Sequence, residues 1–348
     1  MQQIGDTTIR KKKSQPEVPV DPQGETAYRL DCALSSRLNP HETLVVSGFW
    51  RSGTTWLEEA LREILEAKTL FEPLDPLADD MQTVLVHDGV ADKKFEFLRL
   101  YLPYCNAGTL HGHPLYDVFY KALRSESRGS WVRRFRKGLE ESYRSRVVVK
   151  FVTAQLCLRA AQNTFDMPVL HVYRDPRAVV ASIKKTRWHW LFEHLVLRKH
   201  LLRARDGRDE FFGQWREAIL EYDRQKPIAR IAAYWALTEK FLEHSYAGYH
   251  GRAVFVSYEK LAQQREAIFA TLLTQLGLRP AQENFRVSGD DSTTTSDAQR
   301  GASVGERLAG WQRFLTAPEI VEIESIVQRF GMGHRLVNAP EDNNFWRQ

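Results

Sequence analysis

The segment Leu44–Leu57 constrains the fold more than any other part of the chain, because an apolar run passes through a glycine-bracketed loop directly into a helical pattern. Gly48 and Gly53 stand five positions apart, as in a P-loop (G-x-x-x-x-G-K-[ST]). Such a loop aims backbone N–H groups and a helix N-terminus at an anion. Thr54 occupies the position of the P-loop lysine, and the basic residue, Arg51, lies inside the loop. We therefore expect a nucleotide phosphate here, but transfer of a group other than the phosphoryl of ATP.

The composition of the chain excludes several classes of protein. Hydrophobic and charged residues make up 43% and 27% of the 348 residues, which is ordinary for a globular chain with one large or two small domains. No apolar run is long enough to span a bilayer, so we expect neither a transmembrane helix nor a membrane partner. The three cysteines lie far apart without a C-x-x-C pair, which disfavours a disulfide framework or a structural zinc site and predicts a reducing, cytoplasmic compartment.

Short β-branched runs alternate with amphipathic patterns along the chain. The runs are bounded by turn signals, as expected of strands buried on both faces. The alternation predicts an α/β fold in which helices cover both faces of a mostly parallel sheet. The predicted strands are Leu44–Phe49, Val147–Phe151, Val169–Tyr173 and Ala253–Ser257, and the predicted helices are 54–68, 176–186, 261–276 and 318–330.

We expect one domain over residues 41–338, between a polar, loosely held N-terminal tail (1–40) and a short C-terminal tail (339–348). Two segments, about 75–145 and 187–250, interrupt the alternation and are rich in aromatic and charged residues. In parallel α/β folds, ligands bind at the carboxyl ends of the strands. These insertions are therefore expected to shape the pocket of a second substrate.

A second candidate anion site follows the predicted strand 169–173. Arg174 stands at the carboxyl end of this strand, and Asp175 and Pro176 are a favourable N-cap and first residue for the next helix. Ser182 lies two turns into that helix. Arg174 and Ser182 can hold one phosphate between a guanidinium fork and a hydroxyl donor. Taken alone, however, the segment fits a helix start with a surface arginine slightly better.

Together, the two motifs resemble the two cofactor signatures of the sulfotransferases, which use 3′-phosphoadenosine 5′-phosphosulfate (PAPS). The resemblance runs in the correct order over about residues 41–332. Val256–Leu261 resembles the family's Y-E-D-L segment, and Gln299–Thr316 resembles its R-K-G…W…L-T region. It implies an α/β fold with a P-loop-like phosphosulfate-binding loop, PAPS as co-substrate and 3′,5′-ADP (PAP) as product. The net charge of +5 suits this anionic cofactor.

The resemblance also implies roles for individual residues. Arg51 replaces the usual loop lysine and keeps its charge. Trp56 matches the residue that packs on adenine, and Tyr258 matches a further adenine contact. The positions that match the 5′-phosphosulfate loop are Arg51, Ser52, Gly53, Thr54 and Thr55, and those that match the 3′-phosphate ligands are Arg174, Ser182, Arg300 and Gly301.

The catalytic base departs from the cytosolic branch of the family. In that branch a Lys-x-His follows a strand, 24 residues before the 3′-phosphate arginine. Lys150 has this spacing to Arg174, but Val152 stands at the histidine position and cannot accept a proton. Phe71–Leu74 resembles the F-E-P segment of carbohydrate sulfotransferases, which implies Glu72 as the base for in-line transfer to a hydroxyl. Arg51 and Lys150 are expected to stabilise the charge of the reacting groups.

Alternatives for these residues stay open. Glu72 can instead be a solvated loop carboxylate, and His111 and His113 compete for the role of base. The two histidines also suggest a metal, but the sequence places no third ligand, so we expect none. Lys184–Arg208 is either a solvated helix face or a site for an anionic or sugar-like acceptor, and no nucleic-acid-binding motif accompanies its charge.

Two other functions compete with sulfuryl transfer. A P-loop kinase or NTPase needs a Mg²⁺ site, and the sequence offers Thr55 but no convincing acidic partner. A non-catalytic basic protein that binds nucleotides or nucleic acid is the other alternative. We favour a sulfotransferase that acts on a small-molecule or carbohydrate acceptor without nucleic-acid partners, and the sequence leaves the acceptor and the oligomeric state open.

Overall fold

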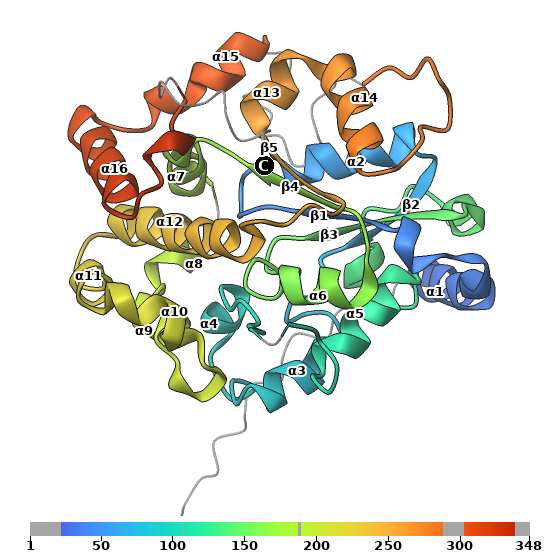
Figure 1. Cartoon of the computed structure of the whole chain (residues 1–348), viewed down its shortest axis with the longest axis horizontal. Helices are drawn as coiled ribbons and strands as arrows, with labels where there is room; N and C mark the ends of the chain where they lie inside the picture. Colours follow the sequence, from blue (N-terminus) through green and yellow to red (C-terminus); the bar gives the residue numbers. More distant parts are fainter. Residues whose placement is uncertain (1–21, 107, 187–188, 288–302, 338–348) are drawn as a thin grey trace, which may run out of the picture.

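One parallel sheet of five strands forms the centre of the molecule (Figure 1). The computed structural model describes residues 22–106, 108–186, 189–287 and 303–337. The strand order is β2-β3-β1-β4-β5, with every neighbouring pair parallel, which confirms the predicted fold class. The strands are β1 (Leu44–Ser47), β2 (Ala67–Phe71), β3 (Arg146–Phe151), β4 (Val169–Tyr173) and β5 (Ala253–Ser257).

The strands are apolar because both faces of the sheet are covered. Along β1, Leu44 and Val46 pack with α2, α13 and α14, whereas Val45 points to the opposite face, toward α5 and α6. Figure 1 shows these two helix layers above and below the sheet. The side-chain period of two thus places successive residues of one strand in two separate cores.

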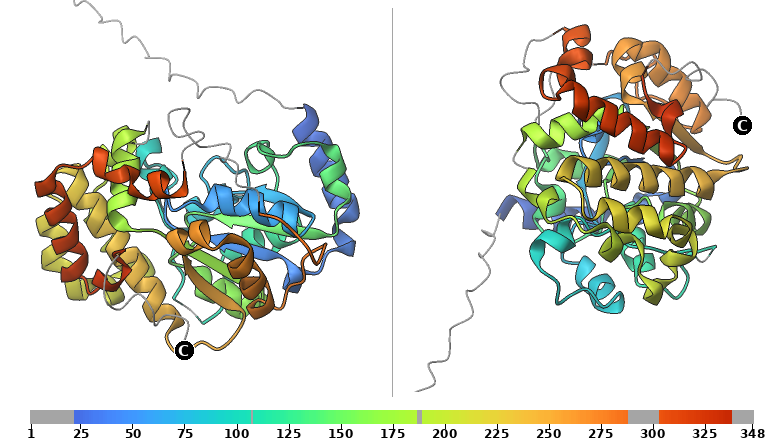
Figure 2. Two further views of the ribbon diagram at one scale, coloured as in Figure 1. Left: turned by 90° about the horizontal axis from the view of Figure 1, so that it is seen from above. Right: turned by 90° about the vertical axis from the view of Figure 1, so that its left-hand side faces the viewer.

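The helices of the described residues include a long buried one within the second predicted insertion. This helix, α12, packs against α7 and α16 (Figure 2) and is apolar around most of its circumference. The helices are α1 (Pro22–Leu34), α2 (Thr54–Ile64), α3 (Met81–His87), α4 (Phe95–Arg99), α5 (Leu115–Leu123), α6 (Leu158–Phe165), α7 (Pro176–Lys185), α8 (His189–Glu193), α9 (Leu197–Leu201), α10 (Arg208–Phe212), α11 (Arg216–Tyr222), α12 (Pro227–Tyr246), α13 (Tyr258–Gln263), α14 (Arg265–Gln275), α15 (Val304–Ala309) and α16 (Ala317–Arg329).

Strand β2 corrects the predicted helix 54–68. The helix ends at Ile64, the chain turns through Glu66 with φ 47°, and Ala67–Phe71 pairs with β3. The sequence pattern did not predict this strand, because a lysine such as Lys68 is unusual in a strand that is buried on both faces. Its ammonium is fully buried and donates to the carbonyl of Ser142 at 3.0 Å.

Helix α1 corrects the prediction of a loosely held tail for residues 22–34. The carboxylate of Asp31 is fully buried and accepts hydrogen bonds from Arg133 Nε at 3.0 Å and Arg136 Nη2 at 2.6 Å. Lys68 Nζ lies 3.6 Å from the same carboxylate. These partners come from distant parts of the sequence, so local composition did not reveal that α1 is fixed to the domain. Residues 1–21 and 339–348 lie outside the described residues.

Other predicted boundaries are close to the observed ones. Strands β4 and β5 coincide with the predicted ranges, and β1 ends at Ser47 rather than Phe49. The predicted helix 261–276 is divided into α13 and α14. Helix α16 begins at the predicted cap, where Thr316 and Glu319 form a reciprocal capping box.

Candidate active site

The loop between β1 and α2 lies against the ends of β4 and β5, and its glycines make this contact possible. A Cβ atom on Gly48 would lie 2.5 Å from the carbonyl oxygen of Val172. Gly53 has φ 90°, and a Cβ atom there would lie 2.4 Å from the ring of Tyr258. Both positions therefore require glycine, one for space and the other for space and backbone conformation.

Arg51 joins the two motifs that the sequence singled out. Its backbone adopts φ 68°, an uncommon conformation for a residue with a side chain. Its Nε donates to Ser182 Oγ at 2.9 Å, and its carbonyl accepts from Arg174 Nη1 at 3.1 Å. The guanidinium of Arg174 also stacks on Tyr258, 4.6 Å from the ring centroid. We call Arg51, Arg174, Ser182 and Tyr258 the arginine cluster.

The arginine cluster carries positive charge that protein carboxylates do not neutralise directly. Within the described residues, neither Arg51 nor Arg174 forms an ion pair, and the buried Nε of Arg174 has no hydrogen-bond partner. Burial, together with the charge of Arg174, lowers the pKa of the Arg51 guanidinium. The hydroxyl of Ser52 is also buried without a partner in this part of the chain. Donors in this arrangement are suited to an anion.

The residues predicted to contact adenine lie together beside the arginine cluster. Trp56, in the first turn of α2, makes an edge-to-face contact with Tyr258 at 5.9 Å between ring centroids. Trp56 makes a similar contact with Phe269 of α14 at 6.0 Å. Because Tyr258 also stacks on Arg174, the aromatic groups adjoin the cationic ones.

A second cluster lies at the carboxyl ends of β2 and β3. Lys150, on β3, is buried, and its Nζ donates to Thr55 Oγ1 at 3.0 Å. The same Nζ lies 3.2 Å from Glu72 Oε1, 3.9 Å from Glu58 Oε2 and 3.7 Å from the ring centroid of Phe71. Thr55, Glu58, Glu72 and Lys150 are called the lysine cluster below.

Glu72 is not the solvated loop carboxylate that the sequence allowed as an alternative. It is buried and follows β2 directly, with φ 48° and its N–H donating to the carbonyl of Lys150 at 2.9 Å. A non-glycine residue in the left-handed region has a conformational cost that its surroundings must offset. Here the backbone bond to Lys150 and the ion pair with the same residue hold Glu72 in place.

Sequence reasoning missed two buried carboxylates beside these clusters. Glu58 lies on α2, and its spacing of three from Thr55 was the available signal, since such residues share a helix face. Glu259 accepts a hydrogen bond from the N–H of Asp175, the residue after Arg174, at 3.1 Å. Burial raises the pKa of Glu259 to about 7, against the opposing effect of Arg174.

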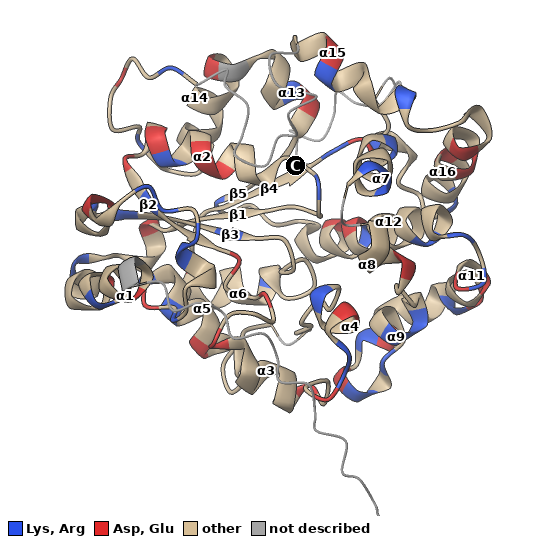
Figure 3. Ribbon diagram, turned by 180° about the vertical axis from the view of Figure 1, so that it is seen from behind, with Lys and Arg blue, Asp and Glu red and all other residues tan. Residues whose placement is uncertain are grey.

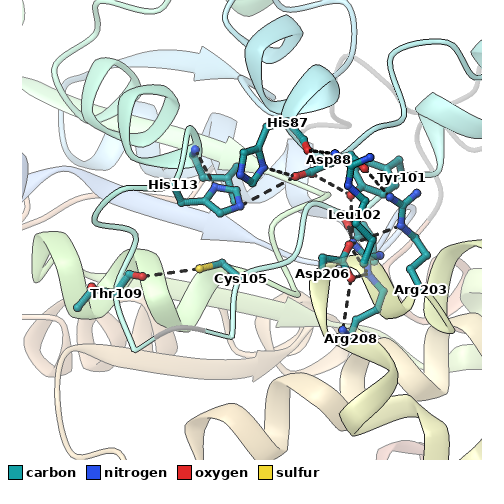
Figure 4. Close-up of polar contacts among 12 residues, drawn as sticks. His87, Asp88, Tyr101, Leu102, Cys105, Thr109, His113, Arg203, Asp206 and Arg208 are labelled. Atoms are coloured by element: carbon teal, nitrogen blue, oxygen red, sulfur yellow. Dashed lines mark hydrogen bonds and ion pairs between the residues drawn. The ribbon is translucent and has the colours of Figure 1, made fainter.

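His113 belongs to a third cluster, formed by residues of α3 and the turn before α5. The side chains of His87, Asp88 and His113 point toward one another (Figure 4), and their ligand atoms lie within 4.8 Å of one another. This group places two other residues beside His113, and His111, the other histidine of the predicted pair, is not part of it. However, the N–H of Leu115 donates to His113 Nδ1, which leaves the ring hydrogen on Nε2, 4.0 Å from Asp88. Asp88 also accepts from Tyr101.

Hydrogen bonds to Asp88 and His113 hold this third cluster: His87 Nδ1 lies 2.9 Å from Asp88, and Tyr101 donates to the same carboxylate. Burial lowers the pKa of His113, and Asp88 opposes that shift. The other candidate base, His111, packs its ring against Tyr116 at 5.5 Å. The contacts of both histidines are thus with α3 and α5, whereas Glu72 contacts Lys150 directly.

Several basic residues of the segment 184–208 form ion pairs or hydrogen bonds with other parts of the domain. Figure 3 shows Lys and Arg gathered along α9, where Arg198 pairs with Asp223 at 2.9 Å. Lys184 pairs with Glu319 at 2.7 Å, and Arg208 is fully buried and donates to backbone carbonyls and Tyr101. Arg300 and Gly301, predicted to contact the 3′-phosphate, lie outside the described residues.

The family model of the sulfotransferase domain matches residues 41–287, which include both clusters. The chain belongs to the sulfotransferase family. It is therefore a PAPS-dependent sulfotransferase, and sulfuryl transfer is its general reaction. Among proteins of curated function, none matches the chain. No helix of the described residues is long and apolar enough to cross a membrane.

Several solved structures are similar to this sulfotransferase at low identity. The sulfotransferase domain of the curacin biosynthetic pathway is 14% identical over 83% of this chain and 97% of its own, with a TM-score of 0.41. Sulfotransferase STF1 from Mycobacterium tuberculosis H37Rv is 15% identical over 88% and 81%, with a TM-score of 0.42. Retinol dehydratase in complex with retinol and PAP is 15% identical over 88% and 85%, with a TM-score of 0.33. The family assignment therefore rests on the domain match.

Proposed function

We propose that this sulfotransferase moves the sulfuryl group of PAPS directly to an acceptor hydroxyl, with Glu72 as the general base. The observation that carries the proposal is the position of Lys150 Nζ, between Glu72 at 3.2 Å and Thr55 of the phosphosulfate loop at 3.0 Å. One ammonium group thus adjoins the candidate base and the loop that the family uses for the reacting end of the donor.

The donor is proposed to lie across both clusters. Its 5′ end would contact the loop from Arg51 to Thr55, at the N-terminus of α2, where backbone N–H groups favour an anion. Its 3′-phosphate would contact Arg174 and Ser182, which are already linked to Arg51. Trp56 and Tyr258 would flank the adenine, and Arg300 and Gly301, which lie outside the described residues, are proposed as further ligands of the 3′-phosphate.

The reaction is a single in-line displacement at sulfur. Glu72 takes the proton of the acceptor hydroxyl, whose oxygen forms a bond to sulfur while the bond from sulfur to the 5′-phosphate oxygen of PAP breaks. Protonation removes the negative charge of Glu72, so the ammonium of Lys150 becomes available to the charge that develops on the leaving phosphate. Arg51 acts on the same charge, and the reaction as proposed uses no metal.

The acceptor is proposed to be a sugar-like hydroxyl or a small natural product. The Phe71–Leu74 segment supports this class because it resembles the corresponding segment of carbohydrate sulfotransferases. Cys32, Cys105 and Cys157 form no disulfide among the described residues, which supports a reducing, cytoplasmic compartment. Neither nucleic acid nor a membrane is proposed as a partner.

Transfer of labelled sulfate from PAPS to a broad panel of hydroxyl and amine acceptors, read by mass, tests this function. We expect a sulfated product from at least one hydroxyl acceptor, together with PAP in equal amount. Calorimetric binding of PAP is measured in parallel, so that donor binding is tested without knowledge of the acceptor. Failure to bind PAP would overturn the donor assignment, and exclusive transfer to amines would overturn the proposed acceptor class.

A further inference from the structure

The carboxyl group of Glu58 is buried beside the reactive part of the site without being fully used by it. Its Oε2 lies 3.9 Å from Lys150 Nζ, and its Oε1 is buried with no hydrogen-bond partner among the described residues. A buried carboxyl oxygen without a partner costs free energy, more so when the group is charged. Burial therefore disfavours the ionised form of Glu58, and the charges around it decide how far.

The charges around Glu58 come from its own helix and from residues on or just after two of the three strands that α2 covers. Lys150 of β3 favours the carboxylate, as does Arg62 of α2, whereas Glu72 after β2 and Glu59 of α2 oppose it. The remaining strand under α2, β1, has the sequence Leu-Val-Val-Ser and contributes no charge. Burial outweighs the attraction of the two cations and raises the pKa of Glu58 to about 8.

These contacts place a protonatable carboxyl group within reach of the ammonium that serves the reaction. We propose that Glu58 is a proton-linked positioning residue, which leaves Lys150 to Glu72 and the 5′ end of the donor when neutral and competes for Lys150 when ionised. This inference rests on the proposed function, because it assigns Lys150 to the donor. Glu58 itself touches neither donor nor acceptor in this proposal and acts through Lys150.

The proposal predicts that donor binding is coupled to uptake of a proton. The 5′-phosphate of PAP near Lys150 adds negative charge close to Glu58, and such a charge favours the neutral carboxyl group. Above about pH 8 the free protein has Glu58 largely ionised, so the bound state takes up as much as one proton. The affinity for PAP then falls with rising pH, by about tenfold between pH 7 and pH 9 at the limit.

The experiment is calorimetric titration of the full chain with PAP from pH 7 to pH 9.5, in buffers of different ionisation enthalpy. The phosphates of PAP are already ionised over this range, because their second pKa is about 6. We expect the wild-type protein to take up protons on binding above pH 8. In Glu58→Gln, which keeps the shape and removes the ionisation, uptake in this window should fall well below that of the wild type, with only the contribution of Glu259 near Arg174 remaining, and the affinity should depend less on pH than in the wild type.

Matched variants separate the possible outcomes. Glu66→Gln makes the same chemical change at an exposed position just beyond α2 and should retain the wild-type profile. Glu58→Met provides a second neutral side chain if Glu58→Gln fails to fold, and the wild-type measurement needs no variant. Equal proton uptake in the wild type and Glu58→Gln, or none in the wild type, would overturn the role of Glu58. Absence of PAP binding in all proteins would instead overturn the proposed function.

Discussion

The arginine cluster and the lysine cluster hold their charges in opposite ways. Arg51 and Arg174 have no ion-pair partners among the described residues, and they are fixed by a hydroxyl, a carbonyl and an aromatic ring. Lys150, by contrast, has the carboxyl groups of Glu72 at 3.2 Å and Glu58 at 3.9 Å. The first cluster is arranged to receive negative charge from outside, whereas the second is internally compensated. In the lysine cluster, the ammonium becomes available to another anion only when a proton or a substrate changes the charge of its carboxyl partners. This property suits a catalytic role better than a role in binding alone.

The largest predicted effect is on turnover and comes from a substitution in the lysine cluster. In Glu72→Gln, turnover should fall about 100-fold or more, because an amide cannot take the acceptor proton, while the affinity for PAP should be kept or increased, since Lys150 loses a competing carboxylate. Steady-state transfer assays and calorimetry measure the two quantities. Near-normal turnover would remove Glu72 from the role of base. Glu66→Gln, at an exposed site, serves as the control and should be fully active.

Charge reversal in the arginine cluster should weaken binding of the donor. Arg174→Glu should weaken PAP binding by about 100-fold, since a charge-assisted contact of up to about 3 kcal/mol is replaced by repulsion. The affinity is measured by calorimetry, with the exposed Arg37→Glu as a control for the change in net charge. Unchanged affinity in Arg174→Glu would mean that this cluster does not bind the donor.

Substitution of Gly53 tests whether the loop between β1 and α2 depends on its close contact with Tyr258. Gly53→Ala places a methyl group against that ring at a residue with φ 90°, so the loop must shift. We expect about a tenfold loss of PAP affinity and a loss of stability of about 1–2 kcal/mol, measured by calorimetry and denaturant unfolding. Gly213→Ala, with open space around its Cβ position and φ −60°, should change neither quantity.

The smallest predicted effect concerns the link between the two motifs. Ser182→Ala removes the acceptor of the Arg51 Nε hydrogen bond and a proposed ligand of the 3′-phosphate. A loss of about 1 kcal/mol corresponds to roughly a fivefold weaker affinity for PAP. A competition assay against labelled PAP measures this difference. Ser245→Ala on α12, which also removes a hydroxyl hydrogen bond, should leave the affinity unchanged.

The sequence predicted one cluster more completely than the other. Arg51, Arg174 and Ser182 stand in two short motifs next to strand ends, and parallel strands bring such ends to one edge of the sheet. The contacts of Glu58 with Lys150 depend on how α2 lies over β2 and β3, which periodicity does not specify.

The two elements that the sequence did not predict, β2 and α1, also depend on contacts between distant parts of the chain. Strand β2 is short and contains Lys68, whose burial makes sense only once Ser142 and the carboxylate of Asp31 are seen beside it. Helix α1 is held by Asp31 through residues about a hundred positions away. Long-range compensation of buried charge leaves no local signal in composition or periodicity.

The buried carboxylate of Asp31 determines where this protein can be shortened. The family match begins at residue 41, so a fragment trimmed to that boundary would lack α1. Lys68, on the strand that precedes the proposed base, and Arg133 and Arg136 would then lose their shared counterion. An enclosed cation without its partner costs several kcal/mol, a large part of the stability of an ordinary domain. Expression designs should therefore begin upstream of Pro22.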